Sequence, residues 1–208
     1  MSCGRCADTK DVCGEHPRFP AAVTVPGHQK HGGEAVRCPA CCPVAFGAAI
    51  SEDRKHGSIV AAGRQASGRL LVDLSPFYDH RRLLVARMVV LYGRHEPVVV
   101  VVNPKSQSAT LVKPLADAGI VVTPMTAADV AVAHGEFLDL VDGGGMEHLD
   151  QKPLTDAVRA AKDRPLAGGK AWEPRVAAVD QGPLVAATGA VWGFLRWEES
   201  SSPGVWAI

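Results

Sequence analysis

The order of apolar and polar positions along the chain predicts an α/β domain that begins near Pro43. Three short apolar runs come first, and we predict strands over residues 44–50, 57–62 and 69–74. A polar turn over residues 63–68 separates the last two runs, and the three runs follow one another closely. We therefore expect the domain to open with an antiparallel meander.

The next part of the chain alternates between helical and strand periodicity. Leu84, Met88 and Leu91 lie at helical spacing, which predicts an amphipathic helix over residues 79–95. The uninterrupted valines at 98–102 are typical of a central strand buried on both faces of a parallel or mixed sheet. The remaining predicted elements are helices at 109–118, 127–141, 154–162 and 183–196 and a strand at 120–123.

A meander followed by alternating helices and strands is the order that a ribonuclease H-like fold requires, although several other α/β folds begin in the same way. The predicted fold class is therefore α/β, with a mixed sheet of meander and parallel strands flanked by helices. In this interpretation residues 44–197 form the domain and residues 198–208 form a flexible tail. Residues 1–43 show no apolar period, so this segment needs a metal, a partner or disorder.

Charge and composition limit the possible functions. Lys and Arg together number 22, as do Asp and Glu, so no overall positive field indicates a nucleic-acid partner and DNA contact needs a local basic patch. No apolar run approaches the length of about 20 residues that a membrane-spanning helix needs. We therefore expect a soluble, cytoplasmic protein with no membrane partner. The arginines of the 79–95 helix either contact DNA phosphates or form a solvated helix face: Arg81, Arg82, Arg87 and Arg94.

All six cysteines lie in the first 42 residues of the chain. Cys3 with Cys6, and Cys38 with Cys41, form two Cys-x-x-Cys pairs, a spacing that suits tetrahedral thiolate coordination of Zn²⁺. The stretch between the two pairs is longer than in an ordinary zinc ribbon. A zinc site is therefore one interpretation, and a disordered, thiol-bearing tail outside the proper domain is the other.

Six segments of the chain carry a further signal: residues 44–54, 91–104, 111–123, 148–154, 157–161 and 180–190. They include Leu-x-x-x-Gly-Ile-Val-Val from Leu115 and Asp-Gln-Gly-Pro-Leu from Asp180. In sequence and in order, these segments resemble the C-terminal, ribonuclease H-like nuclease domain of phage terminase large subunits, especially those of actinobacterial phages and prophages.

The resemblance implies a metal-dependent DNA endonuclease that cuts phage DNA during packaging in a bacterial host cell. Its implied partners are double-stranded DNA and, in the packaging machine, the terminase ATPase, the small terminase subunit or the portal. No Gly-rich Walker sequence followed by Lys-Ser or Lys-Thr occurs in the chain. We therefore expect the nuclease part alone, without the ATPase half.

By resemblance, three acidic residues hold two Mg²⁺ or Mn²⁺ ions, for which carboxylates are the suitable hard oxygen ligands. Asp180 matches the third acid, just before the last helix, and is the leading candidate for a catalytic metal ligand. The first acid aligns with Ala49 and the second aligns with Asn103. Alanine has no ligating atom, and asparagine offers only a neutral carbonyl oxygen. Asp53, just beyond the first strand, is the expected substitute ligand.

Each candidate also has a purely structural interpretation. Asp180 precedes a helix that starts with proline, a position typical of an N-terminal cap. Asp53 belongs to a Glu-Asp-Arg-Lys-His-Gly sequence that is ordinary for a hairpin turn, and Asn103 is typical of the turn before a proline. Other carboxylates that could approach the same edge of the sheet are Glu52, Asp73, Asp139 and Asp142.

Three functions remain open at this point. The first is a terminase-type DNA endonuclease that uses Mg²⁺ or Mn²⁺. The second is a catalytically degenerate terminase relative that keeps the fold and acts only as a DNA-binding or assembly module. The third, more distant, is an adaptor whose Cys-rich arm binds zinc and docks a partner.

Overall fold

The computed structural model describes residues 43–76, 81–166, 168–175 and 178–201 of the chain. None of the helices within these ranges is long and apolar enough to cross a membrane. The predicted zinc ligands, Cys3, Cys6, Cys38 and Cys41, lie outside the described residues.

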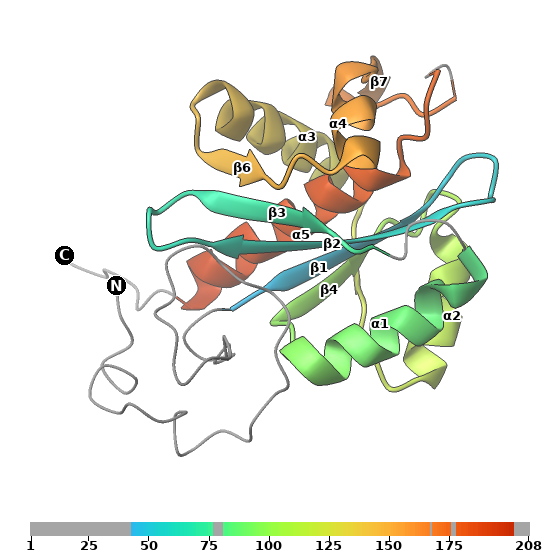
Figure 1. The fold of residues 1–208 in the computed structure, drawn as a ribbon. Coiled ribbons are helices and arrows are strands. Elements are labelled where there is room, and N and C mark those ends of the chain that lie inside the picture. Colours follow the sequence, from blue (N-terminus) through green and yellow to red (C-terminus); the bar gives the residue numbers. More distant parts are fainter. Residues whose placement is uncertain (1–42, 77–80, 167, 176–177, 202–208) are drawn as a thin grey trace, which may run out of the picture.

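A six-stranded mixed sheet forms the centre of the structure (Figure 1). Strands β1 (Ala45–Ile50), β2 (Gly57–Arg64) and β3 (Leu70–Leu74) pair antiparallel in chain order, which confirms the predicted meander. The valine strand β4 (Val99–Val102) pairs parallel with β1, and its last three residues are buried. The order in the sheet is β5-β4-β1-β2-β3-β6, with β5 (Thr123–Pro124) and β6 (Met146–His148) at the two edges.

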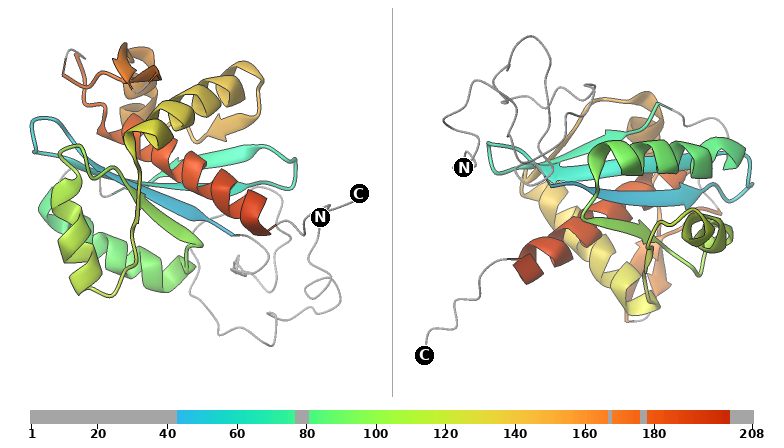
Figure 2. Two further views of the ribbon diagram at one scale, coloured as in Figure 1. Left: turned by 180° about the vertical axis from the view of Figure 1, so that it is seen from behind. Right: turned by 90° about the horizontal axis from the view of Figure 1, so that it is seen from below.

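Helices cover both faces of this sheet (Figure 2). One face is covered by α1 (Arg81–His95) and α2 (Ala109–Asp117). The predicted apolar side chains of α1, Leu84, Met88 and Leu91, are buried against alternate residues of β1 and β4. On the other face, α5 (Gly182–Ser201) packs on β1, β2 and β4. A third layer consists of α3 (Ala127–Asp142) and α4 (Lys152–Arg159), which both pack on α5. The hairpin of β7 (Asp163–Leu166) and β8 (Gly169–Trp172) packs on α3.

Small residues let α5 lie directly on the centre of the sheet. Ala45, Gly47 and Ala49 alternate on the face of β1 that meets this helix. A Cβ atom added to Gly47 would lie 1.9 Å from the carbonyl oxygen of Ala186, so only glycine fits there. The helix is buried along most of its length and continues past the predicted end at residue 196 to Ser201.

The strand predicted over residues 120–123 is present, but it is shorter and begins later than predicted. Gly119 adopts a positive φ of 80°, and the amide of Ile120 donates to the carbonyl of Leu115. This amide therefore closes the end of α2 and is not available to the sheet. Pairing begins only at Thr123, so β5 is reduced to two residues. The short strand β6 and the β7–β8 hairpin are elements that the apolar pattern did not predict.

Candidate functional site

The candidate site lies at the edge of the sheet where β1 and β4 end. These strands are parallel, and Ala48 pairs with Val102 in their register. The next residue of each strand therefore lies at the same level, which places Ala49 beside Asn103. Two of the three positions that the resemblance assigned to acids are thus neighbours.

The amino end of α5 reaches the same edge. A Cβ atom added to Gly182, the first residue of α5, would lie 3.1 Å from Oδ1 of Asp180 and 3.2 Å from Oγ of Ser58. Ser58 is the register partner of Ala49 on the adjacent strand β2. The structure therefore brings together all three positions, of which only Asp180 carries an acid.

Asp180 is half-buried, and its Oδ1 accepts a 2.8 Å hydrogen bond from the amide of Gly182. This bond satisfies one of the amides that a helix leaves unpaired at its start. The carboxylate thus stabilises the first turn of α5, as the capping interpretation expects. It also lies at the candidate site.

The two other matched positions offer little to a metal ion. Ala49 is 1% exposed and lies in the core against α5. Oδ1 of Asn103 accepts a 3.0 Å hydrogen bond from the amide of Lys105, and its main-chain carbonyl accepts one from Oγ of Ser106. The asparagine therefore shapes the turn after β4.

Asp53 belongs to the turn between β1 and β2. Its Oδ1 accepts hydrogen bonds from Oγ of Ser51 at 2.7 Å and from the amide of Lys55 at 3.0 Å. The Ser51 hydroxyl, followed by the Lys55 amide, lowers the pKa of this carboxyl from 3.8 to about 2. These contacts are the turn chemistry of the structural interpretation. Neither Asp53 nor Asp180 is among the residues that line the cavity of about 100 Å³ described below.

Of the other candidates, Glu52 lines the cavity described below. The rest lie elsewhere in the described structure. Asp139 and Asp142 are exposed near the end of α3. Asp73, on β3, accepts a hydrogen bond from Nε2 of Gln151 and lines a second cavity of about 240 Å³ between β2, β3 and α1. Arg87 and Arg94 line this second cavity too, and burial and then the charge of Arg94 lower the pKa of Arg87.

A cavity of about 100 Å³ opens beside Asn103. Its walls come from the ends of β1 and β4, from α3 and α5, and from the β7–β8 hairpin with the loop that follows it. The polar and charged residues of this wall are Glu52, Asn103, Lys105, Ser106, His134, Arg164, Glu173, Arg175 and Thr188.

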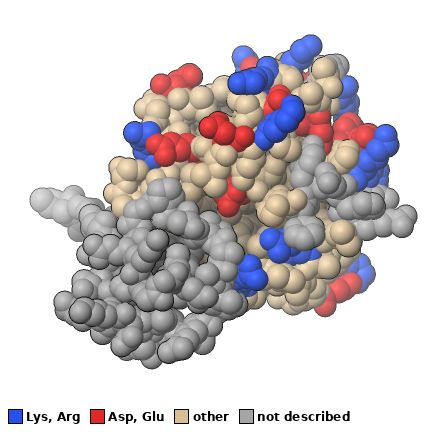
Figure 3. Space-filling view, viewed as in Figure 1, with Lys and Arg blue, Asp and Glu red and all other residues tan. Residues whose placement is uncertain are grey.

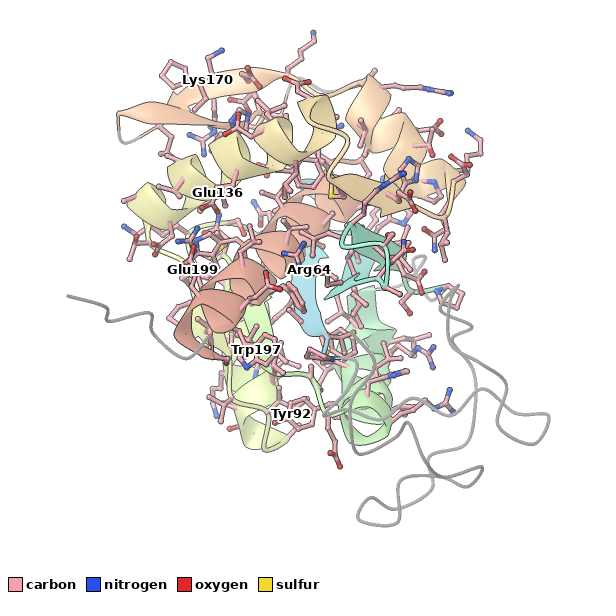
Figure 4. All side chains as sticks on the ribbon, turned by 90° about the vertical axis from the view of Figure 1, so that its left-hand side faces the viewer. Arg64, Tyr92, Glu136, Lys170, Trp197 and Glu199 are labelled. Carbon is pink, nitrogen blue, oxygen red and sulfur yellow. The ribbon has the colours of Figure 1, made fainter. Side chains whose placement is uncertain are left out.

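Trp172 holds the β7–β8 hairpin against the helices. Its Nε1 donates a 2.9 Å hydrogen bond to Oγ1 of Thr188 on α5, and its ring lies 4.2 Å from the ring of buried His134 on α3. Nε2 of His134 lies 3.0 Å from Oδ1 of Asp163. Hydrogen bonds from Lys170, at the outer side of the hairpin in Figure 4, and from His134 lower the pKa of Asp163.

This anchored hairpin brings charged side chains to the cavity. Arg164 lies 3.9 Å from Glu173, and Arg175 lies 3.6 Å from Glu52 of the β1–β2 turn. Together with Lys105 they form a charged cluster, of which only Glu52 was named from the sequence. Lys105 follows Asn103 by two residues, and this position was a sequence signal for a cation at the site. The hairpin gave no such signal, because its sequences Asp-Arg-Pro-Leu and Gly-Lys-Ala-Trp lack the apolar alternation of a strand.

No protein-family model matches this chain, and no curated protein matches it. Solved structures do. The large terminase of bacteriophage HK97 is 14% identical with a TM-score of 0.57, over 73% of this chain and 39% of that one. The large terminase nuclease of thermophilic phage G20c is 15% identical with a TM-score of 0.57, over 72% of this chain and 81% of that one.

The chain has the ribonuclease H-like fold of large terminase nucleases. The nuclease domain of the Thermus phage P74-26 large terminase, 14% identical with a TM-score of 0.50 over 76% of this chain and 80% of that one, has the same fold. The predicted fold class and the resemblance in fold are thereby confirmed. The chain spans about two fifths of the HK97 large terminase, but about four fifths of the separate terminase nuclease structures.

The terminase nuclease of G20c has also been solved with bound magnesium and with bound cobalt. The residues of this chain do not fit the two-metal site that the resemblance implies. Of the three matched positions, Ala49 has no ligating atom, and the side-chain oxygen of Asn103 already accepts the amide of Lys105. Across the described ranges, no three His, Cys, Asp or Glu side chains come together as a group that could hold a metal ion.

Proposed function

We propose that this protein is a catalytically degenerate relative of the terminase nucleases, which binds double-stranded DNA without cutting it. The observation that carries the proposal is the composition of the candidate site. Asp180, Ala49 and Asn103 meet at one edge of the sheet, yet only one of these residues is an acid.

The chemistry of phosphodiester cleavage explains why this loss matters. Two divalent ions at a separation of about 4 Å activate water and stabilise the leaving oxygen, and carboxylates must offset their combined charge. One carboxylate and a neutral amide oxygen supply far less negative charge than three carboxylates. The site is therefore unsuited to hold the metal pair.

The charges near the site favour a DNA-binding role. Lys105, Arg164 and Arg175 line the cavity at the end of the sheet, within reach of a ligand that enters it. Two acids, Glu52 and Glu173, line the cavity too, so its lining carries one more cation than acids. Basic and acidic side chains are also interspersed over the upper part of the face in Figure 3. Since the chain has balanced overall charge, a local cluster of cations is what DNA contact requires.

A metal-dependent endonuclease is the second candidate function, and the position of Asp180 favours it. In that case Asp180 and Asp53 would hold Mg²⁺ or Mn²⁺, and the protein would cut DNA during packaging together with a terminase ATPase, a small terminase subunit or a portal. The turn contacts of Asp53 weigh against this arrangement.

One experiment separates the two candidates. Supercoiled plasmid is incubated with the purified protein and Mg²⁺ or Mn²⁺, and each sample is run on a gel before and after removal of the protein. The proposal predicts retarded plasmid before removal and intact supercoiled plasmid afterwards. Nicked or linear plasmid after removal would support the endonuclease. Zinc analysis of the same protein tests the separate prediction for Cys3, Cys6, Cys38 and Cys41.

A further inference from the structure

The cavity at the end of the sheet carries cations at the edge where the resemblance places metal ligands. Its charged lining consists of Lys105, Arg164 and Arg175 against Glu52 and Glu173. The sum of these charges is positive. A lining of acids, in contrast, attracts a phosphate group only when metal ions stand between them.

Each arginine of this lining has an acidic neighbour but donates no hydrogen bond to it. The Arg164–Glu173 and Arg175–Glu52 ion pairs, at 3.9 and 3.6 Å, are longer than hydrogen bonds. Within the described ranges, neither guanidinium donates a hydrogen bond to a protein acceptor, whereas the guanidinium of Arg64 donates to both Glu198 and Gly68. A guanidinium with free N–H groups is well suited to bind phosphate oxygens.

Lys105 adds a third cation to the lining of the cavity. Its main-chain amide donates to the side chain of Asn103, the position that the resemblance assigns to an acid. The ammonium of Lys105 has no ion-pair partner among the described residues and is exposed to solvent at the cavity. It can therefore approach an anion that enters from outside.

The cations come from elements that are fixed relative to one another. Lys105 follows β4 in the sheet, Arg164 lies on the hairpin that Trp172 ties to α5, and Arg175 follows this hairpin. The backbone that carries the cations is therefore already in place, so ligand binding has to order their side chains alone.

We infer that this cavity binds a phosphodiester group of the DNA backbone directly through Lys105, Arg164 and Arg175, with no metal ion between protein and phosphate. The inference rests on the proposed function, because it locates and explains DNA binding by a site that does not cut. The positive charge that attracts the phosphate then comes from the side chains and not from metal ions.

Fluorescence anisotropy with a labelled DNA duplex tests this inference on the full chain. The expected Kd is the same in EDTA and in Mg²⁺. Lys105→Ala and Arg175→Ala each weaken binding about tenfold, and each lowers the slope of log Kd against log salt concentration by about 0.9. Glu52→Gln removes a carboxylate beside Arg175 and should therefore lower the Kd for DNA.

Lys113→Ala is the matched control. This lysine on α2 is exposed, pairs with Asp117, and does not line the cavity. Circular dichroism verifies that every variant is folded. Binding that disappears in EDTA, or variants at Lys105 and Arg175 that bind like Lys113→Ala, would overturn the inference while the proposed function stands. A wild-type protein that binds no duplex, or that cuts it, would overturn the proposed function itself.

Discussion

Replacement of Gly47 by alanine tests whether α5 lies directly on the central strand. The added Cβ would lie 1.9 Å from the carbonyl oxygen of Ala186 and 2.7 Å from the amide nitrogen of Ala190. Both atoms belong to the backbone of a buried helix, so no side-chain rotation relieves the overlap. The helix must retreat by about 1.5 Å to restore an ordinary van der Waals contact.

The free-energy cost follows from what this retreat disturbs. Helix α5 packs its apolar side chains against β1, β2 and β4 at once, so a shift opens gaps along the whole interface. Overpacking of a core costs about 1–3 kcal/mol when side chains can adjust, and a backbone clash belongs at or above the upper end of that range. We therefore expect the free energy of unfolding to fall by at least about 3 kcal/mol.

Gly189→Ala is the matched control for this variant. Its added Cβ would lie 3.4 Å from Cγ1 of Val101 and 3.9 Å from Sδ of Met125, which are ordinary contacts. Since glycine within a helix is less favourable than alanine by about 1 kcal/mol, this variant should match or exceed the wild type in stability.

Urea unfolding followed by circular dichroism measures both effects. With a slope of about 2 kcal/mol per molar urea, Gly47→Ala should lower the unfolding midpoint by about 1.5 M, while Gly189→Ala should leave it unchanged or raise it. If Gly47→Ala unfolded at the same midpoint as the wild type, the close packing of α5 on β1 would be refuted.

Two further variants test the elements around the site. Trp172→Phe removes the hydrogen bond to Thr188 and should cost about 1 kcal/mol, with faster amide hydrogen exchange in the β7–β8 hairpin; unchanged exchange would contradict the anchoring role. Asp53→Asn tests the turn: the folded pKa of about 2 lies below the ordinary 3.8, so the carboxylate stabilises the fold above about pH 4 and this contribution disappears as the pH falls toward 2. The variant should lack that pH dependence, and an NMR titration of wild-type Asp53 with a midpoint near 4 would contradict the assignment.

The predictable part of the fold is the part in which local periodicity and burial agree. The valines of β4, the helical spacing of Leu84, Met88 and Leu91, and the turn residues of the meander each carry their own signal. Ile120 shows where this reasoning fails. Its apolar character suggested a strand, but the positive φ of Gly119 directs its amide to the end of α2.

The three matched positions of the candidate site could be named from the sequence, whereas the cations of the cavity could not. The register of β1 and β4 places Ala49 beside Asn103, and Asp180 lies near Ser58, the register partner of Ala49. The cations of the cavity were not found because Arg164 and Arg175 approach it from a separate hairpin and its following loop. That approach depends on the tertiary contacts of Trp172, which leave no periodic trace in the sequence.

A plasmid-nicking assay with Mn²⁺, run in parallel on the wild type and on Asp180→Asn, decides whether the candidate site cuts DNA. Both proteins should leave the plasmid supercoiled at every concentration, because the matched positions keep only one acid. Nicking by the wild type that is lost in Asp180→Asn would refute the degenerate site, since it would show that Asp180 still serves a working metal site.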